Sequence, residues 1–257
     1  MWSVINLVED MVDDAVEFLQ TNLQGKKVFV GFSGGKDSVV TARLVEMADL
    51  DHMLCYTNTG IEPPAVVKFV REKYPHCRIV RPKESFWKMI PKRNPPLFHA
   101  KWCCTSLKKE PSRKIDIKDR VMGIRAEESL RRKDYSRIEY FKRQDYTYYY
   151  PILDWKEWQV WEFIKMQNLE VPPLYHKFDR LGCVVCPCRR TKIHDMWKEE
   201  HPGYYKAFES AVRKWWDKRI GQGRTMAYDT VEEFLEDWYK GKAKWYGKQK
   251  GKGGKGE

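Results

Sequence analysis

A short apolar run that ends in a glycine pair constrains this chain more than any other feature. Val28-Phe29-Val30-Gly31-Phe32 has the composition of a buried strand, and Ser33-Gly34-Gly35-Lys36-Asp37-Ser38 follows it directly. Without Cβ atoms, Gly34 and Gly35 let backbone N–H groups approach a ligand, and the positive end of a following helix attracts an anion. Lys36, Ser33 and Ser38 can add donors around the same position. The pattern predicts a phosphate-binding loop between a strand and a helix.

Apolar spacing predicts alternating strands and helices around this loop. Strands are expected over residues 27–32, 52–56, 78–80 and 119–124, and helices over residues 4–23, 37–48, 63–74 and 85–90. Further helices are expected over residues 155–166, 194–200, 202–217 and 231–239. This alternation predicts an α/β fold with a doubly wound parallel sheet, whose ligands gather at the carboxyl ends of the strands. The basic and aromatic stretch 125–150 follows neither period and is left unassigned.

The length of 257 residues allows one principal core and a smaller appendage. We expect a loop-containing domain over residues 1–150 and a helical, cysteine-containing region over residues 151–239 that completes the site. The Gly- and Lys-rich tail, residues 240–257, is expected to be disordered.

Charge favours a polyanionic partner, because 48 Lys and Arg face 36 Asp and Glu, for a net charge of +12. Much of that excess lies in the tail, which could contact nucleic acid or simply keep the protein soluble. Six aromatic residues could stack on bases or fill a core: Tyr140, Phe141, Tyr146, Tyr148, Tyr149 and Tyr150. No apolar run is long enough to cross a bilayer, and no secretory segment is recognisable, so we expect a cytoplasmic protein without membrane contact.

Five of the seven cysteines fall in two tight groups. Cys103 and Cys104 are adjacent, and Cys183, Cys186 and Cys188 lie within Gly-Cys-Val-Val-Cys-Pro-Cys after 78 residues, 105–182. In a reducing compartment such groups indicate metal or redox chemistry before a disulfide framework. Cys55 and Cys77 stand in or beside apolar strands, which favours a packing role.

The loop and four further motifs resemble a known superfamily. Its spacing does not suit a Walker loop, since Gly31 is too close to Lys36, and it is instead similar to the PP-loop Ser-Gly-Gly-x-Asp-Ser of ATP pyrophosphatases. Thr57 to Pro63 resembles the Asp-Thr-Gly-x-x-x-Pro segment of the phosphoadenosine phosphosulfate reductase family, with Asn58 replacing the acidic residue. Gly123 to Arg132 resembles that family's Gly-x-Arg-x-x-Glu-Ser-x-x-Arg, and the stretches around Pro151-Ile152-Leu153-Asp154-Trp155 and the cysteines also match.

The resemblance implies an adenine nucleotide alpha hydrolase-like fold and cleavage of ATP, with Mg²⁺, between the α and β phosphates. By this match the catalytic residues are Lys36, Asp37, Arg125 and Glu128. The nucleotide-binding residues are Ser33, Gly34, Gly35, Lys36, Asp37, Ser38, Thr59, Gly60, Gly123, Arg125 and Arg132. Guanidinium groups suit oxyanions, and Glu128 could orient one of them or bind a metal, whereas the alternative for Arg125, Arg131 and Arg132 is a solvated charged helix face.

The cysteine spacing resembles the [4Fe-4S] signature of adenylylsulfate reductases and of the iron-sulfur PP-loop subunits of DNA phosphorothioation systems. The implied ligands are Cys103, Cys104, Cys183 and Cys186, and Cys188 could replace one of them or act as a sulfur-carrying or redox thiol. A structural zinc site is the main alternative, because four thiolates suit zinc equally well.

Two features separate the activities found among such proteins. The loop is intact, which favours ATP itself as substrate, and no cysteine follows Cys188 in the position of the reductases' C-terminal nucleophile. We therefore expect an ATP pyrophosphatase that adenylylates a nucleic acid for sulfur incorporation, with DNA phosphorothioate modification first and tRNA thiolation next. The alternatives are a sulfonucleotide reductase, an ATP sulfurylase-like enzyme and a non-catalytic nucleic-acid-binding module. A cysteine desulfurase and other modification subunits are the expected protein partners.

Overall fold

The computed structural model describes residues 4–189 and 191–246, which form two compact units. The first unit contains the described parts of Met1–Asn58, Pro64–Arg81 and Pro111–Leu181. The second contains those of Thr59–Pro63, Pro82–Glu110 and Gly182–Glu257. The boundary expected at residue 150 is therefore not where the structure divides the chain. The chain enters the second unit three times, which a linear reading of composition cannot detect.

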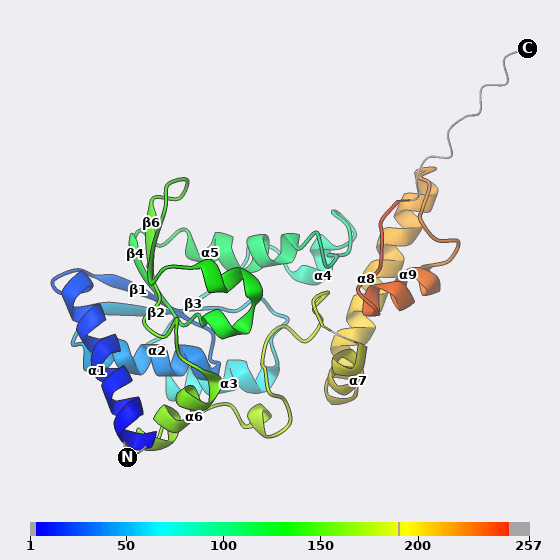
Figure 1. The fold of residues 1–257 in the computed structure, drawn as a ribbon. Helices are drawn as coiled ribbons and strands as arrows, with labels where there is room; N and C mark the ends of the chain where they lie inside the picture. Colours follow the sequence, from blue (N-terminus) through cyan, green and yellow to red (C-terminus); the bar gives the residue numbers. More distant parts are fainter. Residues whose placement is uncertain (1–3, 190, 247–257) are drawn as a thin grey trace, which may run out of the picture. The chain divides into compact units, whose positions relative to one another are not determined.

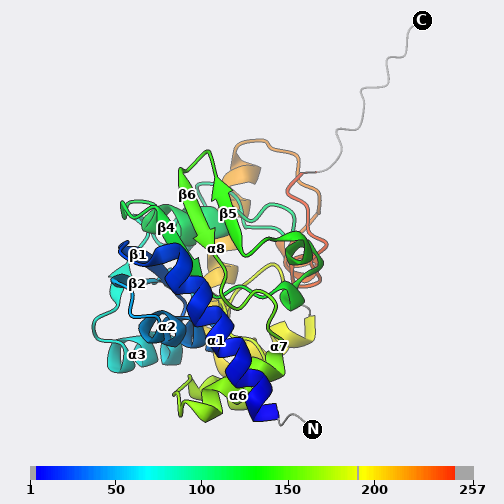
Figure 2. The same cartoon turned by 60° about the vertical axis from the view of Figure 1, so that its left-hand side comes forward.

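The first unit is built on a six-stranded sheet of order β3-β2-β1-β4-β6-β5 (Figures 1 and 2). The strands are β1 (Val28–Phe32), β2 (His52–Thr57), β3 (Arg78–Val80), β4 (Asp119–Met122), β5 (Ile138–Phe141) and β6 (Tyr146–Tyr149). All neighbours are parallel except β5, which pairs antiparallel with β6. The chain builds outward from β1 to β3 and then returns to the other side of β1 with β4. The carboxyl end of β1 is thus the switch point at which ligands bind in such sheets.

Helices cover the sheet of the first unit and supply its main core. They are α1 (Val4–Leu23), α2 (Lys36–Met47), α3 (Pro64–Lys73) and α6 (Glu157–Met166), with short turns η2 (Ala126–Glu128), η3 (Leu130–Asp134) and η4 (Pro173–His176). Val8, Ala15 and Leu19 recur at helical spacing on α1 and are completely buried. They share one apolar cluster with Val28 and Val30 of β1. These helices confirm the expected α/β fold.

The unassigned stretch 125–150 contains β5, β6 and two short turns of helix. Some of its aromatic side chains fill the core and others lie on the surface. Tyr146, Tyr149 and Tyr150 are buried, whereas Tyr140 and Phe141 are exposed. Cys55 and Cys77 are buried, as their apolar surroundings predicted.

The second unit is mainly helical and has an aromatic core. Its elements are α4 (Phe86–Met89), the π-helix η1 (Cys104–Lys109), α7 (Thr191–Glu200), α8 (Pro202–Gly221) and α9 (Val231–Tyr239). The short α5 (Glu110–Ser112) follows η1, and the chain passes into the first unit within it. The rings of Phe208 and Trp238 lie 4.3 Å apart, and Trp238 donates its indole N–H to the carbonyl of Pro96 at 2.6 Å. The aromatic core thereby holds the segment that carries Cys103 and Cys104 against the three long helices.

The start of the tail is ordered within the second unit. Ala243 is buried, and Trp245 donates its indole N–H to the carbonyl of Pro95 at 2.8 Å. Residues 240–246 therefore differ from the expected disorder, and residues 247–257 lie outside the described part of the chain. Among the described residues, no helix is long and apolar enough to cross a membrane.

Candidate functional site

The loop after β1 depends on two glycines for different reasons. Gly34 has φ +72°, and a Cβ there would lie 2.8 Å from Cγ2 of Val70 and 3.1 Å from Cγ1 of Val66. Gly35 is extended and caps the N-terminus of α2, where a Cβ would lie 3.1 Å from the Tyr175 hydroxyl. The first position needs glycine for its backbone conformation and its close packing, and the second for a close approach.

Two serines tie the ends of the loop together. The Ser38 hydroxyl donates to the carbonyl of Gly35 at 2.8 Å and accepts from the backbone N–H of Ser33 at 3.2 Å. The hydroxyls of Ser33 and Ser38 are 3.1 Å apart, and the N–H of Gly35 donates to the Ser33 hydroxyl at 3.3 Å. The loop donors are thus close together and hydrogen-bonded to one another.

Lys36 is 4% exposed and contacts Asp37 and three residues from a distant part of the sequence. Its backbone N–H donates to the Tyr175 hydroxyl at 2.8 Å, and its Nζ lies 3.2 Å from Glu157 Oε1 and 3.6 Å from Asp37 Oδ2. The same Nζ lies 5.4 Å from the Tyr175 ring centre and 6.0 Å from that of Trp161. Two carboxylates and two aromatic faces therefore stabilise this buried cation. Desolvation raises the pKa of Tyr175 to about 12, so its hydroxyl is protonated at neutral pH.

Arg125 follows β4 and joins the loop to the rest of the first unit. Its Nε lies 2.6 Å from Asp37 Oδ1, and its Nη1 lies 2.6 Å from Glu127 Oε2. Glu127 Oε2 also accepts the backbone N–H of Glu157 at 2.8 Å. Gly123 permits this arrangement, because a Cβ there would lie 2.6 Å from the Asp37 carbonyl oxygen. The structure therefore brings together two pairs of predicted site residues that are far apart in the sequence, Lys36 with Asp37 and Gly123 with Arg125.

A second charged cluster lies on the same segment. Glu128 pairs with Arg132 through Oε2 and with Arg180, at 3.2 Å, through Oε1. Burial lowers the pKa of Arg132, and the neighbouring charge of Arg180 acts in the same direction. Arg180 was missed from the sequence, where only its nearness to Gly182-Cys183 could have drawn attention to it. The side chain of Arg131 lies outside the described residues.

Thr59 and Gly60 belong to the second unit, whereas the other residues expected at the nucleotide belong to the first. The Thr59 hydroxyl donates to Glu62 Oε1 at 2.6 Å, and its N–H donates to Oε2 at 2.9 Å. Gly60 has φ +79°, which fits a tight turn around this buried carboxylate. In the second unit, Thr59 lines the cavity that contains the cysteines.

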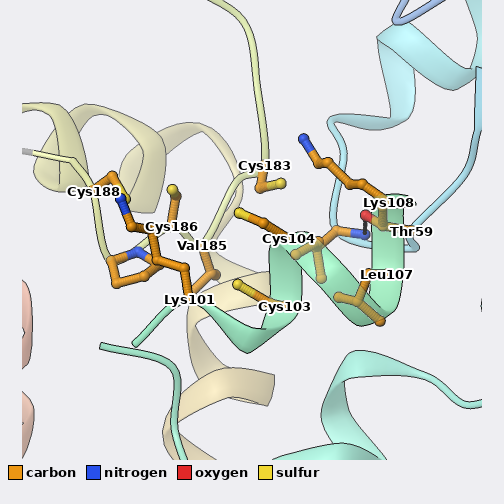
Figure 3. A pocket seen from close by; sticks show the side chains of 12 residues that line it. Thr59, Lys101, Cys103, Cys104, Leu107, Lys108, Cys183, Val185, Cys186 and Cys188 are labelled. Atoms are coloured by element: carbon orange, nitrogen blue, oxygen red, sulfur yellow. Dashed lines mark hydrogen bonds between the residues drawn. The ribbon is translucent and has the colours of Figure 1, made fainter. Parts of the chain in front are cut away.

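Five cysteines line this one cavity of the second unit (Figure 3). Cys104 is the first residue of η1 and Cys103 precedes it, whereas Cys183, Cys186 and Cys188 come from the loop before α7. A hydrogen bond from the N–H of Val184 to the carbonyl of Ile61, at 2.7 Å, fixes that loop. Lys101 and Lys108 complete the polar part of the lining. The structure thus gathers the two cysteine groups that the sequence separates.

Adjacent thiols and the two lysines decide which sulfurs ionise. A hydrogen bond with Cys103 and the charges of Lys108 and Lys101 lower the pKa of Cys104 to about 6. A hydrogen bond with Cys186, with Lys101 adding to it, lowers the pKa of Cys188 to about 6. The pKa of Cys103 and that of Cys186 rise, because each gives its proton to such a bond and is buried. Each neighbouring pair therefore shares one proton.

The donor set suits a thiolate-bound metal, since sulfur ligands select zinc or iron-sulfur centres. Within residues 4–189 and 191–246, however, no three Cys, His, Asp or Glu side chains stand close enough together to hold a metal ion. The chemistry of the lining fits such a group, although the cysteines of the cavity stand farther apart than metal ligands do.

A mostly parallel sheet with a glycine loop at its switch point, and cationic side chains around that loop, is the arrangement with which α/β proteins commonly bind anions. Residues 27–189 match the phosphoadenosine phosphosulfate reductase domain, and the chain belongs to that family. A phosphoadenylyl-sulfate reductase from Candida auris, solved as a phosphate complex, shares the adenine nucleotide alpha hydrolase-like fold. The TM-score is 0.53 at 16% identity, covering 71% of this chain and 97% of that one.

Curated relatives fall into two groups. Protein MJ0066 of Methanocaldococcus jannaschii is 30% identical over 236 residues, covering 84% of this chain and 48% of the relative. Adenosine 5'-phosphosulfate reductase of Neisseria meningitidis serogroup B is 31% identical over 207 residues, covering 74% and 78%. The chain spans about half the length of MJ0066 and of a second archaeal relative, MJ0973. The family and its named relatives are enzymes of sulfur-related nucleotide chemistry.

Proposed function

We propose that this protein is an ATP pyrophosphatase that transfers AMP to a nucleic acid, activating it for sulfur incorporation. The observation that carries this proposal is the intact loop, in which Lys36, Asp37 and Arg125 form one network at the carboxyl end of β1. A donor set of this kind is needed when pyrophosphate leaves, because charge develops on the departing oxygens.

The reaction assigns a task to each group. The acceptor oxygen attacks the α-phosphorus, the bond from that phosphorus to the β-bridging oxygen breaks, and pyrophosphate leaves with the bond electrons. Backbone N–H groups and hydroxyls of Ser33 to Ser38 bind the phosphates together with Mg²⁺. Lys36 exchanges Glu157 for the leaving pyrophosphate, and the guanidinium groups of Arg125 and Arg132 bind further phosphate oxygens. Glu128 positions Arg132.

The cysteine cavity would hold a [4Fe-4S] cluster through Cys103, Cys104, Cys183 and Cys186. When bound, such a cluster supplies a site for sulfur transfer or shapes the acceptor pocket. Cys188 is then a fifth thiol, free to carry sulfur or to replace a ligand. A cysteine desulfurase and further modification subunits would supply and use that sulfur.

A nucleic-acid acceptor is supported by the net charge of +12. DNA phosphorothioate modification is the first target and tRNA thiolation the second. The test is a pyrophosphate assay with ATP, Mg²⁺ and either DNA or tRNA, followed by a search for adenylylated acceptor. Stoichiometric release of AMP or adenylyl-acceptor and pyrophosphate is expected, and no release with either acceptor would overturn the proposal.

Sulfonucleotide reduction is the second candidate, because relatives that are up to 31% identical carry the name adenosine 5'-phosphosulfate reductase. In this chain Cys188 is the last cysteine and would have to act as the nucleophile. Sulfite formation from adenosine 5'-phosphosulfate and a thiol reductant, abolished in Cys188→Ser, would favour this candidate over ATP cleavage.

A further inference from the structure

The β5–β6 hairpin carries a row of aromatic rings on one face of the sheet. Phe141 pairs with Tyr146 and Glu139 pairs with Tyr148, so these side chains share a face. Tyr140 pairs with Thr147 and projects to the opposite face. The two sides of one hairpin therefore differ, and the aromatic row belongs to only one of them.

The rings follow one another along the strand at stacking distances. Phe141 and Tyr148 are 5.1 Å apart in an edge-to-face arrangement. Tyr148 and Tyr150 are 6.3 Å apart with planes at 15°, and Tyr150 and Tyr135 are 5.9 Å apart with planes at 27°. Phe141 is 40% exposed and Tyr148 and Tyr135 are half-buried, so three of these rings reach solvent.

A fifth ring, Tyr146, lies on the same face with its centre 6.4 Å from that of Tyr148, and it is held in place by contacts with neighbouring segments. The Arg120 guanidinium lies 3.7 Å from the ring centre of Tyr146 and is anchored by the carbonyl of Ile115 at 2.8 Å. Tyr146 donates its hydroxyl to the carbonyl of Arg113 at 3.0 Å. Rings held in this way lose little conformational freedom when a flat partner stacks on them.

Basic side chains surround the outer end of the row. The exposed ones are Arg113, Lys114, Lys118, Lys142 and Arg143. The exposed acids on the same segments are Asp116 and Asp145, both paired with Lys118. The half-buried Glu139 lies on the same face as the rings and accepts a hydrogen bond from the Tyr150 hydroxyl at 3.3 Å. Burial raises the pKa of Tyr148, and the charges of Arg120 and Arg113 oppose that rise. The surroundings of the rings thus carry an excess of positive charge.

The inner end of the row reaches the candidate nucleotide site. The N–H of Tyr135 donates to the carbonyl of Arg132 at 3.2 Å, and Arg132 pairs with Glu128. A ligand that follows the rings from the hairpin tip therefore arrives at the arginine cluster beside the loop. An extended molecule with flat, spaced groups and a negative backbone would match that path.

We infer that the aromatic row of Phe141, Tyr148 and Tyr135 is a stacking platform for single-stranded nucleic acid, with Arg113, Lys142 and Arg143 on its backbone. Bases stack on such rings without regard to sequence, and basic groups track the phosphates. The inference rests on the proposed function, because the platform would guide the acceptor strand to the loop. It adds where that strand lies and that it is single-stranded at this point.

Binding of labelled oligonucleotides of about 12 nucleotides to the full chain, without ATP, tests the platform. Phe141→Ala should weaken binding of single-stranded DNA or RNA by roughly 5-fold or more, since each stacked base contributes that much. Tyr140→Ala is the matched control, because it removes a more exposed ring from the other face, and it should change binding by less than about 2-fold.

Charge reversal gives a second, independent measurement. Lys142→Glu with Arg143→Glu should lower the slope of log affinity against log salt by about 1.4 for a single strand, whereas Lys68→Glu with Lys165→Glu on α3 and α6 should not. Unchanged circular dichroism checks folding. Equal losses in the hairpin and control variants, or tighter binding of duplex than of single strands, would overturn the platform. Pyrophosphate release from ATP is measured separately, with a mononucleotide as acceptor, because a single nucleotide cannot span the row of rings. Failure of the platform and failure of ATP cleavage are therefore distinguishable.

Discussion

The loop of the first unit and the cysteine cavity of the second concentrate reactive groups by opposite means. Around the loop, Lys36, Asp37, Arg125 and Glu157 carry permanent charges that already neutralise one another. In the cavity, a cysteine is charged only when its thiol loses a proton, and this ionisation depends on the neighbouring thiols and on Lys101 and Lys108. An anion that binds at the loop would replace a carboxylate in one of these ion pairs. A metal cation that binds in the cavity would instead displace protons from the thiols.

The two regions also tolerate change differently. The loop is shaped by backbone, because Gly34, Gly35 and Gly123 each stand where an added Cβ would meet a neighbour at 3.1 Å or less. The cavity is shaped by side chains on η1 and on the loop before α7. Substitutions should therefore damage the loop through geometry and the cavity through the loss of a donor.

The largest effect is expected in the cavity. Cys183→Ala removes a donor from a site that needs four, so anaerobically purified protein should fall from about four iron atoms per chain to well below one. Cys77→Ala, a buried cysteine of the other unit, should keep the full metal content. Elemental analysis and the visible absorption spectrum measure both. Zinc in place of iron in the unmodified protein would contradict the cluster and favour a structural site.

At the loop, Lys36→Ala should lower turnover by roughly 100- to 1000-fold, because one preorganised cationic donor to the leaving group is lost. Lys68→Ala removes an exposed lysine of the same unit and should leave the rate unchanged. Initial rates of pyrophosphate release at saturating ATP compare the two. Equal rates in all three proteins would remove Lys36 from the reaction.

Backbone geometry predicts a loss of stability next. In Gly123→Ala the new Cβ would meet the Asp37 carbonyl oxygen at 2.6 Å and Thr41 Oγ1 at 2.7 Å, so the free energy of unfolding should fall by about 1–3 kcal/mol. Gly203→Ala on α8 has open space around its Cβ and should be neutral or slightly stabilising. Urea denaturation distinguishes them, and equal stability of the two variants would show that α2 yields at this point.

The smallest effect is expected at Tyr175, whose hydroxyl accepts a hydrogen bond from the first backbone N–H of α2. Tyr175→Phe should tighten pyrophosphate binding by roughly 2- to 10-fold, because that N–H no longer has to leave a partner. Tyr74→Phe, elsewhere in the first unit, is the control. Weaker binding in Tyr175→Phe, measured by calorimetry, would instead make the hydroxyl a phosphate contact.

Sequence patterns predicted what is local. The strand, loop and helix at residues 27–48 follow from an apolar run, two glycines and helical spacing, and all are present. Gly123 and Arg125 could be assigned to the same site because the carboxyl ends of parallel strands share one edge. The family match over residues 27–189 bears out the resemblance that these motifs carried.

Contacts between residues that are far apart in the chain could not be predicted from local sequence patterns. Glu157, Trp161 and Tyr175 surround Lys36 from more than a hundred residues away. Trp161 and Tyr175 lie in a stretch that resembles the family, but no sequence pattern predicted that they contact the loop. The hydrogen bonds from Thr59 to Glu62 were not predicted, because nothing in the sequence shows that the chain enters the second unit at residue 59. The strands β5 and β6 could not be predicted from alternation of apolar and polar residues, because aromatic residues lie on both faces of the hairpin.

The position of the bond broken in ATP tests the central claim most directly. ATP labelled separately at the α and γ phosphates is incubated with the protein, Mg²⁺ and single-stranded nucleic acid, and the products are separated. We predict that the γ label appears in pyrophosphate and the α label in AMP or on the acceptor, and that Lys36→Ala suppresses both. Appearance of the γ label as inorganic phosphate with ADP, or no cleavage alongside reduction of adenosine 5'-phosphosulfate, would contradict the account.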